Sequence, residues 1–209
     1  MLASISPVGE AGRGQRWTIT VTAFTLASTA AGAAVGGALG LAGAWIAGAA
    51  LVGAWSPAIA AVVLGVLAVL GASVDAGRLP LTVPSWRRQV DERWLTSFRG
   101  WVYGAGFGAQ LGAAVLTVVP TAATYVAFGS ALLVAGVSGQ AVAGAAIGAT
   151  FGLGRAVPVL ATARWRDPER LRASFHRFDA SRTRAATATV AGQLVVAAGA
   201  VALVPFVAS

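Results

Sequence analysis

The sequence predicts an all-α fold, a polytopic transmembrane helical bundle with five spans. Only 11% of the 209 residues are charged, whereas soluble domains carry about 25%. The charges are also clustered, because residues 17–74 and 185–209 contain none and residues 100–163 contain only Arg155. A spanning helix needs about 20 mostly apolar residues, so these three stretches have room for about five spans.

The chain divides into a short tail, residues 1–16, and one transmembrane domain, residues 17–209. The segment from Trp17 to Trp55 is long for one helix and short for two. One long tilted helix followed by a re-entrant or exterior segment gives five spans, whereas a tight hairpin gives six. The five predicted spans are 17–44, 57–74, 101–128, 138–163 and 186–207.

Arginines set the predicted orientation, since short cytoplasmic flanks of membrane proteins carry an excess of basic residues. The loops 77–100 and 164–185 are rich in arginine, and the connection 129–139 has no charge. We therefore expect the protein in a bacterial cell (inner) membrane, with both basic loops on the cytoplasmic side. The N-terminus is also expected in the cytoplasm, because Arg13 and Arg16 precede the first span, and the C-terminus is expected outside.

Each basic loop contains a predicted amphipathic helix at the headgroup level, with Trp and Arg as anchors. In the second loop, Asp167-Pro168-Glu169 is a favourable helix start. The apolar positions that define the two helices are Trp86, Val90, Trp94, Phe98 and Trp101, then Leu171, Phe175 and Phe178. We expect these loops to bind anionic lipid headgroups. Docking of a membrane protein partner or of a second copy of the chain is the alternative.

Several classes of chemistry are excluded or disfavoured. The net charge of +8 does not indicate nucleic-acid binding, because such proteins place basic residues on a soluble scaffold. Cysteine is absent, which excludes disulfides and thiol chemistry. His176 is the single histidine, and no catalytic triad or phosphate-binding loop is visible. We expect no enzyme activity, no metal and no cofactor.

Three predicted spans carry glycine at four-residue spacing. Such stripes let helix backbones approach closely, and we interpret them as packing faces. The stripes are Gly32/Gly36/Gly40, Gly104/Gly108/Gly112 and Gly144/Gly148/Gly152. A weak internal duplication also relates Ala109-Gln110-Leu111 to Gly192-Gln193-Leu194. Chance similarity in alanine-rich sequence is the alternative explanation.

Arg155 is the leading candidate for a functional residue. It lies roughly 13 Å at helical rise before the loop residue Arg164, and an ionisable group at that depth is costly. We predict that it binds an anionic solute or pairs with Asp75, near the end of the second span. Snorkelling to the interface is the alternative. Its neighbours Gly152, Gly154 and Pro158 predict a locally broken helix.

Other polar residues within the predicted spans form a candidate polar pathway. Gln110 and Gln193 are amides at matching places in two spans, although hydrogen bonding between helices is the simpler interpretation. A proline amid threonines often marks a kink whose freed backbone groups bind hydroxyls. The third predicted span contains such a group, namely Thr117, Pro120, Thr121 and Thr124.

Three segments carry a resemblance to a known family: Gly77-Arg78-Leu79-Pro80, Gly104-Ala105-Gly106-Phe107-Gly108-Ala109 and Gly152-Leu153-Gly154-Arg155-Ala156-Val157-Pro158. From about residue 56 onwards, the chain resembles the CcdA/DsbD-type membrane proteins, which belong with the LysE-like transporters. The resemblance implies six spans in two halves and an electron relay through one cysteine per half. The chain has no cysteine, at 118–121 or elsewhere, and its first half is short. We expect part of the fold but not the relay.

The leading functional hypothesis is a small transporter or exporter of a small solute, with an anion as one option. The alternative is a non-catalytic assembly or maturation factor, derived from a CcdA-like fold, that docks a partner protein. A lipid-modifying enzyme is disfavoured, because no acid/base pair is visible.

Overall fold

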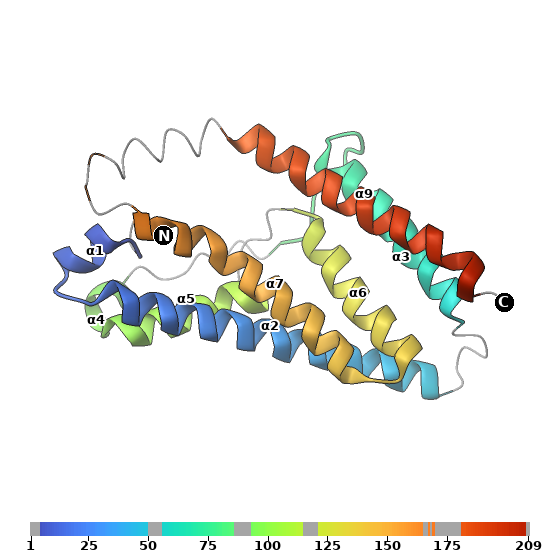
Figure 1. The fold of residues 1–209 in the computed structure, drawn as a ribbon, viewed down its shortest axis with the longest axis horizontal. Helices are drawn as coiled ribbons and strands as arrows, with labels where there is room; N and C mark the ends of the chain where they lie inside the picture. Colours follow the sequence, from blue (N-terminus) through green and yellow to red (C-terminus); the bar gives the residue numbers. More distant parts are fainter. Residues whose placement is uncertain are drawn as a thin grey trace. The chain divides into compact units, whose positions relative to one another are not determined.

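The computed structural model describes residues 5–49, 56–85, 93–114, 121–164, 167, 169 and 181–207. Every regular element in these residues is helical (Figure 1), which confirms the all-α class for this part of the chain. The elements are α1 (Pro7–Gly12), α2 (Trp17–Gly48), α3 (Pro57–Asp75), α4 (Trp94–Ser97), α5 (Gly100–Ala113), α6 (Ala123–Ser138), α7 (Ala141–Ala161), the 3-10 helix η1 (Thr162–Arg164) and α9 (Arg182–Val207).

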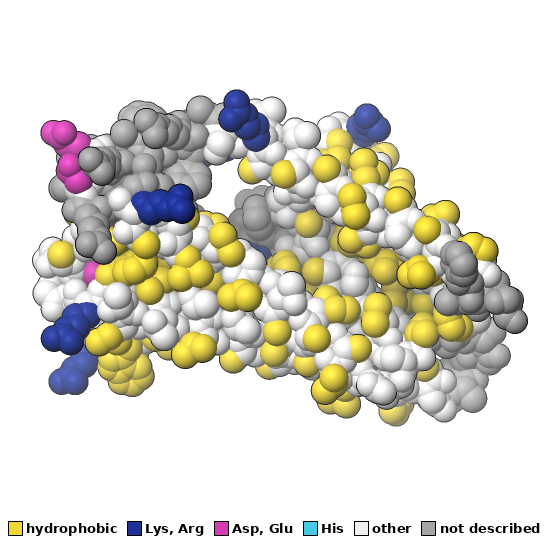
Figure 2. All heavy atoms as spheres, in the orientation of Figure 1, with side chains coloured by type: hydrophobic (Ala, Val, Ile, Leu, Met, Phe, Trp, Pro, Cys, Tyr) yellow, Lys and Arg dark blue, Asp and Glu magenta, His cyan; other side chains and the backbone are white. Residues whose placement is uncertain are grey.

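Four of these helices are long and apolar enough to cross a membrane: α2, α3, α7 continued by η1, and α9. Their outer faces carry large apolar side chains, such as Trp45, Val142 and Val195, which are 69%, 74% and 71% exposed. Figure 2 shows apolar side chains over α7 and α9. Extended apolar surface of this kind is costly in water, so these helices are compatible with a membrane-embedded protein.

The predicted single helix over 101–128 is wrong. Helix α5 ends at Ala113, because Ala114 adopts the left-handed conformation with a φ of 56°, a backbone geometry that commonly terminates helices. A second helix, α6, then begins at Ala123 and continues to Ser138. The segment 129–138, which we expected to be a loop, is therefore helical. Thr117 and Pro120 lie outside the described residues.

Two further expectations concern helix continuity: the single long helix over 17–44 agrees with α2, whereas the break at 152–158 is corrected. Helix α2 is unbroken from Trp17 to Gly48, so no hairpin occurs before residue 48. Helix α7 is unbroken through Pro158, so the predicted break at 152–158 is absent. Since proline has no N–H group, the Gly154 carbonyl loses its helical donor. The ring is accommodated without ending the helix.

The predicted interfacial helices fall largely outside the described residues, since 86–92 and 170–180 are not described. In the first loop, α4 is short, and the Trp94 ring stacks against Phe107 with centroids 6.2 Å apart. In the second loop, the Asp167 carboxylate accepts a hydrogen bond of 3.0 Å from the Glu169 N–H. This is the capping bond expected of the predicted helix start.

The packing of the chain defines two compact units, and α2 and α7 contribute to both. Unit 1 comprises Met1–Gly32, Trp86–Val118 and Ala149–Arg182. Unit 2 comprises Ala33–Ser85, Val119–Gly148 and Thr183–Ser209.

Within unit 1, α5 runs parallel to the first half of α2 through the predicted glycine stripe. A Cβ atom at Gly104 would lie 2.6 Å from the Thr20 carbonyl oxygen, and one at Gly108 would overlap that of Phe24. Within unit 2, a Cβ at Gly36 would lie 2.8 Å from the Cα of Gly148. The stripes are therefore sites of direct backbone contact, as predicted.

The N-terminal residues pack into unit 1 instead of forming a free tail. Ile5, Ser6 and Glu10 are fully buried. The Gly100 N–H donates to the Gln15 side chain over 3.1 Å, and the Thr162 hydroxyl donates to the Ile5 carbonyl over 3.3 Å. The start of α2, the start of α5 and the end of α7 thus lie at one end of unit 1.

Candidate functional site

Asp75 is the last residue of α3 and the first component of the site. Helix α3 begins with Ser56, whose hydroxyl accepts from the Ile59 N–H, and with Pro57 in the first turn. Its final residue is an acid, which is unfavourable because the C-terminal end of a helix carries partial negative charge. The carboxylate must therefore be stabilised by groups from other helices.

The first of those groups is the N-terminal end of α6. The Ala122 N–H donates to Asp75 Oδ1 over 2.8 Å. Ala122 has no side chain that could cap α6, so the carboxylate supplies the missing acceptor. The positive end of one helix dipole thereby offsets the unfavourable end of another.

The second group is the side chain of Gln193, which is 3% exposed in the middle of α9. Its Nε2 donates to Asp75 Oδ2 over 2.9 Å. Gly71 leaves room for this contact, because a Cβ there would lie 3.4 Å from Nε2 and 3.0 Å from Val126 Cγ2. Three helices therefore converge on one carboxylate.

The other end of the Gln193 amide is unsatisfied. Its Oε1 is buried and has no hydrogen-bond partner among the described residues. Turning the amide over would place Oε1 against the Asp75 oxygen, so the bond to Asp75 fixes its orientation. A buried acceptor without a donor costs about 1–3 kcal/mol, so a ligand or water that donates to this oxygen would lower the free energy.

The structure thus brings together part of the predicted polar pathway in unit 2. Asp75 and Gln193 are in direct contact, and Thr121 and Thr124 flank the N-terminal turn of α6, where Thr124 is 3% exposed. The other predicted residues are not part of this group. Thr117 and Pro120 are not described, whereas Gln110 and Arg155 belong to unit 1.

Arg155 is partly buried in α7. Its guanidinium carbon lies 5.5 Å from the centre of the Phe151 ring, a distance at which the ring face attracts a cation. Among the described residues of unit 1, an ion pair joins Arg13 to Glu10, and no carboxylate lies within ion-pair distance of Arg155. Pairing with Asp75 stays a prediction, because the two residues belong to different units.

Sequence reasoning missed a buried polar cluster at the end of unit 1. Glu10 is 0% exposed. Its carboxylate accepts from the Tyr103 hydroxyl over 2.6 Å and from the Thr20 hydroxyl over 2.7 Å. It also pairs with Arg13 over 2.6 Å. Burial lowers the pKa of Arg13, but the hydrogen bonds to Glu10 and Tyr103 raise it by more than burial lowers it. The net shift of the pKa is therefore upward, and Arg13 stays charged.

A signal for this cluster was present in the sequence. Glu10 is the single acidic residue before Asp75. Ser6 and Pro7 begin a helix, with the Ser6 hydroxyl accepting from the Gly9 N–H over 3.1 Å. A capped helix that carries one acid beside an apolar span indicates a docked segment.

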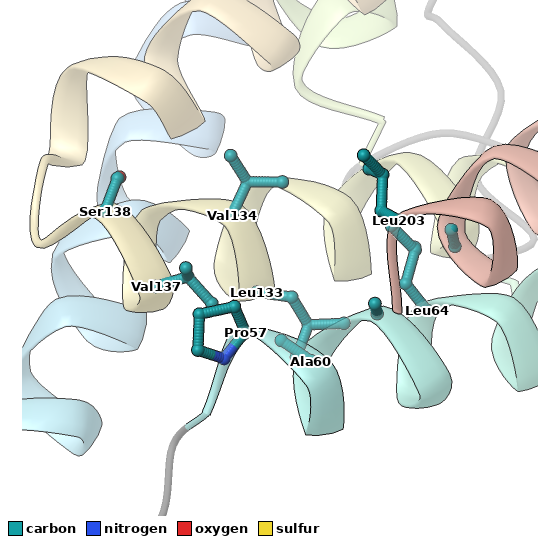
Figure 3. A pocket seen from close by; sticks show the side chains of 10 residues that line it. Pro57, Ala60, Leu64, Leu133, Val134, Val137, Ser138 and Leu203 are labelled. Atoms are coloured by element: carbon teal, nitrogen blue, oxygen red, sulfur yellow. The ribbon is translucent and has the colours of Figure 1, made fainter. Parts of the chain in front are cut away.

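A cavity of about 250 Å³ lies elsewhere in unit 2, among α3, α6 and α9. Figure 3 shows that its lining side chains are almost all apolar, including Pro57, Leu133 and Val137. Pro57 and Asp75 are at opposite ends of α3, about 27 Å apart at 1.5 Å per residue. The cavity is therefore separate from the contact of Asp75 with Ala122 and Gln193.

Comparisons with known proteins add no relative: no family model, curated protein or solved structure matches the chain. Within the described residues, no group of three or more His, Cys, Asp or Glu side chains could hold a metal ion. The described residues of the two units offer single charges, amides and helix ends as binding groups.

Proposed function

We propose that the chain is a small membrane transporter or exporter whose solute is a small anion. The observation that carries this proposal is Arg155, a partly buried cation in a helix long and apolar enough to span a membrane. A charge at that depth costs several kcal/mol unless it is paired or solvated. With no carboxylate among the described residues of unit 1 in reach, an anionic solute can supply the compensating charge.

The chemistry of arginine defines the solute more closely. Its planar guanidinium offers parallel N–H donors that match a carboxylate or another planar anion at two points. The Phe151 ring beside it leaves the remaining N–H groups to a ligand. We therefore expect a small planar anion to be the preferred solute.

The contact among Asp75, Gln193 and the start of α6 in unit 2 supports the transport proposal independently of Arg155. Transporters commonly use discontinuous helices whose ends face ions or solutes. Here α6 begins at Ala123 after an interruption, and its first turn meets Asp75 and Gln193. Helices that end inside a bundle at polar side chains provide binding groups that continuous apolar helices lack.

Replacing Arg155 tests the proposal. Arg155→Lys and Arg155→Ala should both retain protein level but lose uptake of a planar anion, by about tenfold or more for the loss of one charge-assisted contact. Lysine fails because an ammonium lacks the fork geometry. The measurement is uptake of labelled acetate, nitrate and phosphate into vesicles that contain the purified protein, with Arg164→Lys, at an exposed position, as the matched control.

Two other results would contradict anion binding. Normal uptake in both variants would show that Arg155 only anchors the helix, and no uptake by the natural protein would favour an assembly factor. Reduced protein levels that recover in an Arg155→Ala/Asp75→Ala double variant would indicate a structural ion pair.

Topology offers a separate prediction. The start of α2, the start of α5 and the end of α7 lie at one end of unit 1, beside Arg16, Arg99 and Arg164. Placing this end in the cytoplasm follows the rule for basic flanks and puts the C-terminus outside. A reporter fused after Ser209 should be active outside the cytoplasm, and activity restricted to the cytoplasm would reverse the orientation.

The resemblance to CcdA/DsbD-type proteins stays a proposal about ancestry. In its glycine segments at 104–109 and 152–158, Gly104, Gly108 and Gly152 are accounted for by backbone contacts with α2. These contacts are a general solution to helix packing in lipid and do not depend on that family.

A further inference from the structure

We propose that Asp75 and Gln193 bind a monovalent metal cation where α3, α6 and α9 meet in unit 2. The two side chains that meet there carry three oxygen atoms, namely the two carboxylate oxygens of Asp75 and the Oε1 of Gln193. The amide of Gln193 is held against the carboxylate by its Nε2, 2.9 Å from Oδ2, and Oε1 is bonded to the same carbon as Nε2.

The charge of Asp75 is not balanced by a basic side chain among the described residues of unit 2. The hydrogen bonds to its carboxylate come from the Ala122 N–H and from Gln193 Nε2, and both donors are neutral. Arginine pairs with acid at Arg13 and Glu10, in unit 1. A cation bound beside this carboxylate would supply the positive charge that its neutral donors lack.

The unsatisfied oxygen of Gln193, the side chain beside Asp75, also favours a bound cation. Oε1 is buried and has no donor among the described residues, and Gln193 as a whole is 3% exposed. A water molecule could donate to Oε1 but would not neutralise Asp75. A cation coordinated by both side chains satisfies the amide and the charge together.

The ligand atoms also indicate the class of cation. Carboxylate and amide oxygens are hard ligands, which suit alkali and alkaline-earth ions better than transition metals. A single carboxylate balances one positive charge, so a divalent ion would leave an excess charge among apolar helices. The site therefore fits a monovalent ion such as Na⁺ or K⁺.

In the proposed transporter, this ion would accompany the solute. That role rests on the proposed function, whereas cation binding itself does not. Binding is measurable in detergent without any solute, so a failure of transport and a failure of cation binding give separate results.

Thermal unfolding of the full chain in detergent tests the proposal, at one pH and one ionic strength, in sodium, potassium or choline chloride. Choline is too large for a site formed by two side chains. A ligand that binds only the folded state raises the Tm in a saturable way. We expect a rise of about 3 °C or more in sodium or potassium relative to choline, together with saturable binding of ²²Na⁺ or ⁸⁶Rb⁺.

Asp75→Asn is the informative variant, because it removes the charge and keeps the size. Its amide oxygen can still accept from the Ala122 N–H, and its N–H can donate to a Gln193 amide that has turned over. The variant should therefore fold, be at least as stable as the natural protein in choline, and show the same Tm in all three salts. Gln193→Leu should reduce the cation response, and Asp167→Asn, at an exposed loop position, should leave it unchanged.

Equal Tm values for the natural protein in the three salts, with no saturable ²²Na⁺ or ⁸⁶Rb⁺ binding, would overturn the proposal. An undiminished cation response in Asp75→Asn would also overturn it, because the ion would then bind elsewhere. If only a lower pH in choline chloride raised the Tm, the occupant would be a proton and not a metal ion.

Discussion

Gly108→Leu should prevent correct folding of unit 1. Even a Cβ atom at this position would overlap the backbone carbonyl of Phe24 in α2, and a backbone cannot move aside as a flexible side chain can. Overpacking of an ordinary core costs about 1–3 kcal/mol, and a clash with backbone should exceed that range. We expect a large loss of monodisperse protein in detergent and a lower Tm in whatever is recovered.

Gly199→Leu is the matched control, since it makes the same change in the apolar helix α9, where a Cβ would meet nothing within 4 Å. Its yield and Tm should stay close to those of the natural protein. If Gly108→Leu behaved like this control, the contact between α2 and α5 would be absent from the folded protein.

Glu10→Ala should be the most destabilising substitution among the acidic residues that the structure describes. It would remove the carboxylate that pairs with Arg13 and accepts from the Tyr103 and Thr20 hydroxyls. Removing one member of a buried ion pair typically costs about 3–5 kcal/mol. The measurement is the Tm in detergent, which should fall clearly below that of the natural protein.

Two variants show whether the buried geometry causes the effect. Glu10→Gln keeps the shape and one acceptor oxygen, so it should cost less than Glu10→Ala. Glu169→Ala removes an acid at an exposed position and should change the Tm little. A similar Tm for Glu10→Ala and Glu169→Ala would mean that α1 does not dock as described.

Much of the fold could be predicted from apolar runs and glycine spacing. The predicted spans 57–74 and 186–207 correspond closely to α3 and α9, because charged residues or strong helix signals lie at their ends. The glycine stripe at Gly104, Gly108 and Gly112 correctly indicated close backbone contact, since no other residue allows it.

The break between α5 and α6 could not be located from composition. The interruption begins at Ala114, which adopts a positive φ although alanine is a strong helix former. Residues 101–128 also contain no charged residue, so hydropathy alone predicts one span. What stabilises the break is a hydrogen bond from Ala122 to Asp75, 47 positions earlier in the chain, and such a tertiary contact leaves no local pattern.

For the same reason, only part of the site could be predicted from the sequence. Asp75 and Gln193 stood out as polar residues in or near apolar spans, and the structure places them in contact. Glu10 was overlooked because its burial depends on partners distant in sequence, Tyr103 among them. Arginines at 13 and 16 suggested a solvated tail, yet the segment between the first residues and α2 packs against three helices.

The hydrogen bond between Ile5 and Thr162 joins the beginning of the chain to a residue made much later. At a synthesis rate of about 5–20 residues per second, the ribosome needs about 8–30 s to progress from one to the other. The segment from Ile5 to Glu10 therefore cannot complete its contacts until the end of α7 has been made. Docking of this segment should be a late step in the biogenesis of unit 1.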